Sequence, residues 1–455
     1  MKLKRILSSF LAVVMAFGVV SLATVDENGN IFGNTLTAEA ATEKTATKMP
    51  DNAITFSSTY SDELEIIPAA SKNGMYYYNN KVIYFYSVAN NTFRKIYDYN
   101  DKGRNKDAVI CVYADAEKGK FYIVWLDSSN QNKKYYYLDE FDVKSEKFVS
   151  TKDISSLVGS NNLSYPESLG VDSRNRYYLA VYDSNQDKYI INLISADMKL
   201  LSSAVAGDAV YKFSGFDKTN GNFYFEGYTD WIYWGYSHDT QSLKCGNVKN
   251  NNKISISNYY VDILYQQYYT PHYDNAVMLT NGDFVWTSTM SGAVRVLDSA
   301  KFDIADKDSS LPLKLSVSRS GYEIEDRYAD SIGTRTVYNA ATGDYLMYVN
   351  DNTIAELDSE GNKKSTFKTA YPVFAMYNYG DSVLVIEKDT DENFYVENLK
   401  WAYPTKITLS KTSATIKVGE SLSLKATSDS ALDISFTWSS SNNSVASVTK
   451  DGKRS

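Results

Sequence analysis

The sequence predicts an all-β protein, a β-propeller of about seven blades followed by an incomplete β-sandwich. Tyrosine accounts for 39 of the 455 residues and phenylalanine for 19, and both favour pleated, half-buried strands. Between residues 60 and 400 no helical periodicity is present, and short apolar or alternating runs recur between turn residues. One strand and turn unit repeats along this region, which is typical of a repeat architecture.

Composition and charge argue against several classes of function. A chain with 43% hydrophobic and 22% charged residues buries more than one core, and its length allows two or three domains. The net charge of -8 argues against a broad nucleic-acid interface, because phosphates need a positive face. Two histidines and two cysteines disfavour histidine-dependent chemistry and sites with several cysteine ligands. We therefore expect no nucleic-acid partner, no metal and no cofactor.

The amino terminus has the features of an export signal. Basic residues at positions 2, 4 and 5 precede an apolar stretch over residues 6–25. Ala38-Glu39-Ala40 has small residues at the two positions that a signal peptidase recognises. The pattern predicts a signal peptide at residues 1–40 and a linker at 41–51. Cleavage after Ser21-Leu22-Ala23, or retention of the apolar stretch as an anchor, are the alternatives. We expect a secreted or surface-associated protein with no membrane span after cleavage.

The repeated unit is a turn with Gly or Asn, an aromatic strand, a second turn and another strand. Clear copies begin at Lys118, Asn220, Asn281 and Thr342. Units start near residues 62, 108, 166, 210, 274, 333 and 372. Successive aromatic strands are roughly 38 to 61 residues apart, close to the 40 to 50 residues of a four-stranded propeller blade plus variation in loop length. Stacking such sheets around an axis covers both faces of each one. The pattern predicts a propeller over residues 52–402.

Two further features follow from the blade assignment. The last unit is one strand short, and the run Ala53–Ser57 is predicted to supply the missing outer strand, so that deleting residues 51–60 destabilises the ring. Cys111 is predicted on an inner strand and Cys245 on an outer strand of another blade. Such positions are too far apart for a disulfide bridge, which favours two buried free thiols.

The carboxyl-terminal segment has the motifs of a known module. Ile407-Thr408-Leu409, Val418-Gly419-Glu420, Thr437-Trp438 and Asp451-Gly452 occur in order, with alternating apolar residues around a tryptophan. Residues 403–455 resemble a bacterial Ig-like domain of group 2, but the family pattern continues with strands beyond Ser455. The resemblance implies a small, truncated sandwich of the kind found in adhesins and in accessory modules of secreted surface proteins.

Candidate binding residues cluster in and after the fourth unit. Aromatic rings flanked by Asp, Asn and Gln suit sugar recognition, because a pyranose face stacks on a ring while its hydroxyls bond to polar groups. The alternative is that these rings fill the space between blades. The candidate ligand-binding residues are Trp231, Trp234, Tyr259, Tyr260, Tyr268, Tyr269 and His272.

Carboxylates are the candidate catalytic groups if the protein is an enzyme acting on carbohydrate. Glycoside hydrolysis needs two of them, and the sequence offers Glu323, Glu325 and Asp326, with Asp239, Asp262 and Asp274 elsewhere. On an acidic protein such residues are the expected background, so no catalytic residue is assigned. Two acidic runs, 183–187 and 389–393, lack the glycine and glutamate of an EF-hand loop and are predicted to be blade turns.

The sequence thus predicts a secreted or cell-surface binding or adhesion protein. The propeller is its recognition head for carbohydrate or another surface ligand, and the Ig-like module is a spacer. An extracellular carbohydrate-active hydrolase or lyase with acidic residues on the propeller is one alternative, and a protein-interaction scaffold is the second. The expected partner is an extracellular glycan or protein.

Overall fold

The structure is a computed structural model of the whole chain. It describes residues 7–11, 18–25, 31–41, 46–55, 64–100, 109–130, 133–159, 163–210, 212–218, 220–233, 236–249, 251–262, 276–288, 293–297, 313–318, 336–340, 342–350, 352–360, 363–400, 407–411, 422–428, 435–438 and 453–454. The chain divides into two compact units, Ala46–Asn398 and a second made of Met1–Thr45 with Leu399–Ser455.

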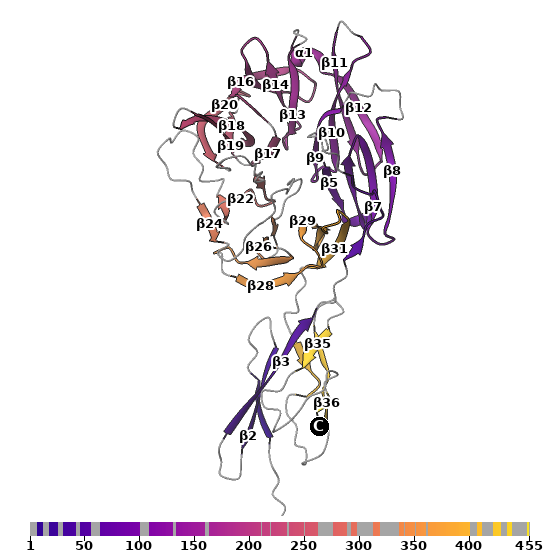
Figure 1. Cartoon of the computed structure of the whole chain (residues 1–455), viewed down its shortest axis with the longest axis vertical. Coiled ribbons are helices and arrows are strands. Elements are labelled where there is room, and N and C mark those ends of the chain that lie inside the picture. Colours follow the sequence, from indigo (N-terminus) through magenta and orange to yellow (C-terminus); the bar gives the residue numbers. More distant parts are fainter. Residues whose placement is uncertain are drawn as a thin grey trace, which may run out of the picture. The chain divides into compact units, whose positions relative to one another are not determined.

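The described part of the larger unit forms seven four-stranded antiparallel sheets arranged in a ring (Figure 1), which confirms the predicted propeller. Blades 1 to 4, from the innermost strand outwards, are β5 Leu64–Ala69, β6 Gly74–Asn79, β7 Val82–Ser87 and β8 Thr92–Asp98; β9 Val109–Asp115, β10 Lys120–Asp127, β11 Tyr135–Asp142 and β12 Lys147–Asp153; β13 Tyr165–Val171, β14 Tyr177–Asp183, β15 Lys188–Ile194 and β16 Leu200–Gly207; β17 Lys212–Phe216, β18 Asn222–Tyr233, β19 Tyr236–Val248 and β20 Ile254–Asp262. Blades 5 to 7 are β21 Ala276–Met278, β22 Phe284–Ser288, β23 Ala293–Leu297 and β24 Leu313–Ser318; β25 Thr336–Asn339, β26 Asp344–Asn350, β27 Thr353–Leu357 and β28 Lys363–Lys368; β29 Val373–Tyr379, β30 Ser382–Lys388, β31 Phe394–Lys400 and β4 Thr47–Lys48.

Glycine and asparagine set the turn that precedes the second strand of a blade. Gly221 and Gly343 have φ of +76° and +79°, and Asn175 has a φ of +59° at the same point of blade 3. Left-handed backbone of this kind is tolerated by glycine and asparagine far better than by β-branched residues. The repeated Gly or Asn in the sequence therefore marks a backbone requirement. Two short helical turns, η1 Ala70–Lys72 and α1 Ser155–Val158, lie among the described strands.

The ring is closed by an N-terminal strand, as expected, but the strand is not the predicted one. β4 pairs with β31, with Thr47 opposite Val396, and the described part of the predicted run, residues 53–55, does not take that position. The chain turns at Pro50, and the buried side chains of Ala53 and Ile54 instead fill the core between blades 1 and 7. A proline and a left-handed residue at position 52 prevent a continuous strand here.

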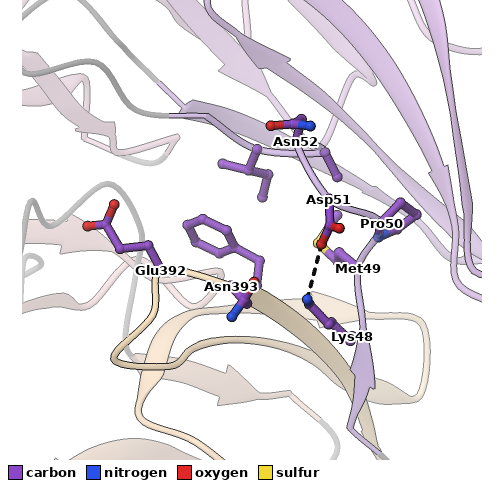
Figure 2. A pocket seen from close by; sticks show the side chains of 10 residues that line it. Lys48, Met49, Pro50, Asp51, Asn52, Glu392 and Asn393 are labelled. Carbon is purple, nitrogen blue, oxygen red and sulfur yellow. Dashed lines mark ion pairs between the residues drawn. The ribbon is translucent and has the colours of Figure 1, made fainter.

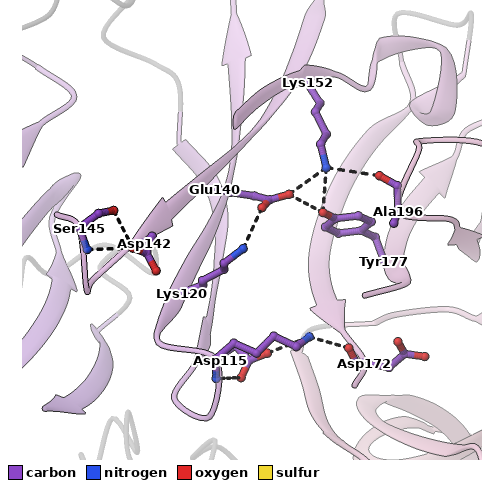
Figure 3. Close-up of polar contacts among 10 residues, drawn as sticks. Asp115, Lys120, Glu140, Asp142, Ser145, Lys152, Asp172, Tyr177 and Ala196 are labelled. Atoms are coloured by element: carbon purple, nitrogen blue, oxygen red, sulfur yellow. Dashed lines mark hydrogen bonds and ion pairs between the residues drawn. The ribbon is translucent and has the colours of Figure 1, made fainter. Parts of the chain in front are cut away.

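Tyrosine is abundant because it joins blades. A buried ring fills the space between two sheets while its hydroxyl bonds to an acceptor of the neighbouring blade. Tyr177 of blade 3 donates to Glu140 of blade 2 at 2.5 Å, and Lys152 and Lys120 reach the same carboxylate at 2.8 and 3.3 Å (Figure 3). Tyr345 of blade 6 likewise donates to Asp283 at 2.6 Å.

Both cysteines are buried and free, as predicted. Cys111 lies on the innermost strand β9, whereas Cys245 lies on β19, the third strand of blade 4 and not its outermost one. The outermost position is taken by β20.

The smaller unit contains short antiparallel sheets. β1 Leu7–Leu11, β2 Gly18–Val25, β3 Ile31–Ala41 and β35 Ser435–Trp438 form one sheet, in which Ala38 is opposite Trp438. β32 Ile407–Leu409 pairs with β34 Ala426–Ser428, and β33 Leu422–Ser423 pairs with β36 Lys453–Arg454. Cleavage of residues 1–40 stays a prediction. Among the described residues, no helix is long and apolar enough to cross a membrane.

Candidate functional site

Strand register defines one face of the propeller. In blade 1, Leu64 at the start of β5 is opposite Asn79 at the end of β6, and Asp98 at the end of β8 is opposite Val82 at the start of β7. The same end of a blade therefore holds the turn between its second and third strands and both of its links to neighbouring blades. We call this end of the ring the connection face.

Three of the sequence-predicted aromatic residues, Trp231, Tyr259 and Tyr260, lie on strands of blade 4 at this face. β18 and β19 stay paired from Tyr228 to Tyr233, beyond the point where their pairing with β17 and β20 stops, so residues 228–233 and 236–241 form a two-stranded ribbon. Trp231 lies in the ribbon, opposite His238. Tyr259 and Tyr260 lie on β20. Trp234, Tyr268, Tyr269 and His272 lie outside the described residues.

Few of the sequence-predicted carboxylates fall in described segments. Asp239 is opposite Asp230 in the ribbon and Asp262 ends β20, whereas Asp274, Glu323, Glu325 and Asp326 lie outside the described residues. The acidic runs 183–187 and 389–393 are blade turns, as predicted, closed by backbone hydrogen bonds such as the one from Gln186 to Asp183. The described residues contain no group of side chains suited to a metal ion.

Three tyrosines of blade 3 form a cluster at the connection face that the sequence did not predict. Tyr165 begins β13 and is opposite Tyr182 near the end of β14, which is opposite Tyr189 near the start of β15. The ring centroids of Tyr165 and Tyr182 are 5.2 Å apart, and those of Tyr182 and Tyr189 are 5.4 Å apart. The hydroxyls of Tyr165 and Tyr189 are 3.4 Å apart. We call these three residues the tyrosine cluster.

The cluster is the exposed end of the packing between blades 3 and 4. Side chains alternate along a strand, so Tyr178, Ala180 and Tyr182 of β14 share one side of the sheet. Tyr178 and Ala180 are buried against Phe213 of blade 4, and Tyr189 packs at the margin of the same core. Tyr165 is 37% exposed and the other two rings are half-buried. The rings therefore have a rigid base and an accessible edge.

A carboxylate accompanies the cluster. Glu167 is the extra residue of a β-bulge, since Pro166 is opposite Val181 and Ser168 is opposite Ala180. A bulge redirects a side chain, and bulges are frequent beside functional sites. Burial raises the pKa of Glu167. Among the residues that the structure describes, Glu167 has no hydrogen bond or ion pair.

The hydroxyls of the cluster are also affected by their surroundings. Burial raises the pKa of Tyr189, helped by the hydrogen bond with Tyr165 and then by the charge of Glu167. The hydrogen bond that Tyr182 donates to Asp187, at 2.6 Å, raises the pKa of Tyr182. The hydroxyls of Tyr182 and Tyr189 therefore stay protonated at neutral pH, and Tyr182 has an acidic acceptor, Asp187, beside it.

The central channel is bridged near the same face. Glu65 of blade 1 and Lys212 of blade 4 approach to 3.6 Å, although two blades separate them around the ring, so the pair crosses the channel. Burial raises the pKa of Glu65 despite Lys212, and burial also raises the pKa of Tyr113 and Tyr377. The ion pair therefore joins blade 1 to blade 4 across the centre of the ring.

A small cavity of about 220 Å³ lies at the seam where the ring closes (Figure 2). Residues 48–54 and 392–394 line it, and Lys48 forms an ion pair with Asp51 at 3.1 Å. The buried neighbours Met49 and Phe394 belong to the closure core. The cavity is thus part of the seam. The tyrosine cluster is the better candidate because its accessible rings lie beside a carboxylate, Glu167, that has no ion pair with any described residue.

Comparison with known proteins agrees with the carboxyl-terminal module. The bacterial Ig-like domain (group 2) matches residues 404–454, so the chain carries this domain. No curated protein sequence matches the chain significantly.

Similar solved structures are distant. A streptogramin B lyase is 8% identical over 80% of this chain and 98% of its own, with a TM-score of 0.40. The AfRom2 CNH domain is 10% identical over 78% and 99%, with a TM-score of 0.39. Raptor from Chaetomium thermophilum is 8% identical over 75% of this chain and 28% of its own, with a TM-score of 0.42. The propeller assignment rests on the seven sheets and their closure.

Proposed function

We propose that this chain is a binding protein of the cell exterior. Its propeller is the recognition head and binds carbohydrate at the connection face, on the tyrosine cluster and the adjacent ribbon of blade 4. The Ig-like module is a spacer. One observation carries the proposal: three tyrosine rings in contact, accessible at one edge and accompanied by acidic side chains.

Sugar chemistry suits this surface. The apolar face of a pyranose packs on an aromatic ring, and its hydroxyls bond to phenol and carboxylate groups. The tyrosine cluster provides rings that are already ordered by the core of blades 3 and 4, so little conformational entropy is lost on binding. Asp187 and the phenol hydroxyls supply acceptors and donors at its rim.

The exterior location is supported by two independent features. The group 2 Ig-like domain is typical of extracellular and surface proteins, and it is present at residues 404–454. The amino terminus has the basic and apolar regions of an export signal. Fractionation of expressing cells, with sequencing of the mature amino terminus, tests this part: we expect the chain in the medium or envelope, and intact cytoplasmic chain would contradict it.

A glycan array probed with the purified chain tests carbohydrate binding. We expect binding to at least one glycan class, lost by more than tenfold in a Tyr165→Ala/Tyr189→Ala variant. Tyr371→Ala is the matched control, because Tyr371 stacks on Tyr395 in blade 7, with centroids 4.0 Å apart, away from the cluster. Equal loss in both variants, or no glycan binding, would contradict the proposal.

The same samples test the alternatives. A reducing-sugar assay on each bound glycan should show no release, because no catalytic carboxylate pair is expected at the cluster. Release of reducing sugar without unsaturated products would favour the hydrolase alternative, and new unsaturated products would favour the lyase alternative. Protein capture without glycan binding would favour a scaffold.

A further inference from the structure

We propose that the tyrosine cluster with Glu167 forms a subsite for a sugar residue that bears a free, protonated amino group. This inference rests on the proposed carbohydrate binding and names the ligand class. It follows from three observations: the position of Glu167 in the blade repeat, the charges around the cluster, and the chemistry of the rings.

The blade repeat shows that a glutamate is not needed at the bulge. The inner strands of blades 2, 4 and 7 have the same extra residue near their start, and it is Ile110, Ser214 and Phe374 respectively. Ile110 and Phe374 pack on the hydrophobic cores, and Ser214 bonds to Glu226 at 3.2 Å. Only in blade 3, among these four described bulges, is the residue charged. The fold accepts apolar or hydroxyl residues at this position, so the bulge itself does not require the charge of Glu167.

The charges near the cluster are predominantly negative. Asp187 accepts the hydrogen bond of Tyr182, and Asp183 accepts those of the turn residues Asn185 and Gln186. Lys188, which follows this turn, forms an ion pair with Asp208. Glu167 is therefore a half-buried carboxylate without a cation from the described residues. A charge in this position is costly unless a positive group reaches it.

The rings favour the same ligand. The face of a tyrosine ring carries negative electrostatic potential and attracts a cation within about 6 Å. The tyrosine cluster can therefore bind both the pyranose ring and its ammonium group, and Glu167 is the counter-ion of the ammonium group. An N-acetylated sugar has no positive charge and forfeits the attraction to Glu167, so the site discriminates amine from amide at the same carbon.

The test compares two oligosaccharides that differ only in this group. Isothermal titration measures binding of a glucosamine tetramer and of an N-acetylglucosamine tetramer to the full chain at neutral pH and about 0.15 M salt. We expect the amine to bind at least tenfold more tightly. In Glu167→Gln the preference should fall below threefold, while affinity for the acetylated tetramer stays unchanged.

A charge control separates the subsite from general attraction to an acidic protein. Glu392→Gln removes one exposed carboxylate from the blade 7 turn, far along the ring from blade 3. The amine preference should survive in this variant, and equal loss in both variants would overturn the inference. If Glu167→Gln does not fold by circular dichroism, the preference of the unmodified chain decides: a ratio below threefold overturns the inference.

The outcomes also separate this inference from the proposed function. Glycan binding on the array without an amine preference removes the amino-sugar subsite and leaves the carbohydrate-binding function standing. Absence of any glycan binding removes both.

Discussion

Blade 3 packs against blade 2 through Tyr177 and presents Tyr182 and Tyr189 on its side toward blade 4. Each side combines tyrosine with a glutamate, but the two glutamates differ in their partners. Glu140 meets two lysines and a tyrosine hydroxyl, and although burial alone would raise its pKa, these partners hold the pKa at about 2 (Figure 3). Glu167 has no such partners among the described residues, and burial raises its pKa. A glutamate whose hydrogen-bond and ion-pair partners are all supplied by the protein has a structural role. A glutamate without such partners is available to a ligand.

The largest expected effect on stability is at Glu140, on the side of blade 3 that faces blade 2. Glu140→Gln leaves Lys120 and Lys152 without their counter-ion and weakens the bond from Tyr177, so it should lower the free energy of unfolding by about 3 kcal/mol. Denaturation in urea measures it. A loss below about 0.5 kcal/mol, the range of ordinary surface changes, would mean that Glu140 is not a structural clamp.

The two glutamates should also differ in the sign of their pH dependence. The pKa of Glu140 is lowered in the fold, so its stabilising contribution is present above 4.5 and lost as the pH falls toward about 2. The pKa of Glu167 is raised, so its contribution is present below 4.5 and lost as the pH rises through the folded value. The deficit of Glu140→Gln should therefore shrink in acid. Urea melts of both variants between about pH 3 and pH 7 measure these trends, and parallel trends would refute the contrast.

A pair of hydroxyl deletions sharpens the comparison. Tyr177→Phe removes a buried hydrogen bond to a charged carboxylate and should cost about 2 kcal/mol. Tyr189→Phe removes only a long contact with Tyr165 and should cost less than about 0.5 kcal/mol. Thermal unfolding of the two variants gives the difference, and equal losses would contradict the assignment of the tyrosine cluster as a non-structural surface.

The smallest effect is expected for Glu167→Gln in the absence of ligand. Because burial opposes the charge of Glu167, its removal should leave stability unchanged or raise it by up to about 1 kcal/mol at neutral pH. A destabilisation of more than about 1 kcal/mol would show that Glu167 has a structural partner and would weaken the case for a ligand there.

The sequence predicted the blades well because each begins with a strong local signal. The predicted starts at 62, 108, 166, 210, 274, 333 and 372 fall within a few residues of the observed strands. The closing strand was misplaced because a two-residue strand at Thr47–Lys48 has no periodicity to detect, whereas Ala53 and Ile54 are apolar for a different reason, burial in the closure core.

The site was harder to predict than the fold. Aromatic runs are visible in the sequence, which is why Trp231 and its neighbours were selected. Tyr165, Tyr182 and Tyr189 are far apart in the chain and meet only through strand register, which depends on the exact turn lengths. The bulge that redirects Glu167 has no local signal either. Alternation from the buried Tyr178 through Ala180 to Tyr182 was the one usable indication.

Hydrogen exchange with and without a bound glycan tests the central claim most directly, because it locates the binding surface on the whole chain. Slower exchange is expected over residues 163–167 and 181–190 of blade 3, and in the blade 4 ribbon, with no change over residues 389–395 of blade 7. Protection confined to the closure seam, to the Ig-like module or to other blades would contradict binding at the tyrosine cluster.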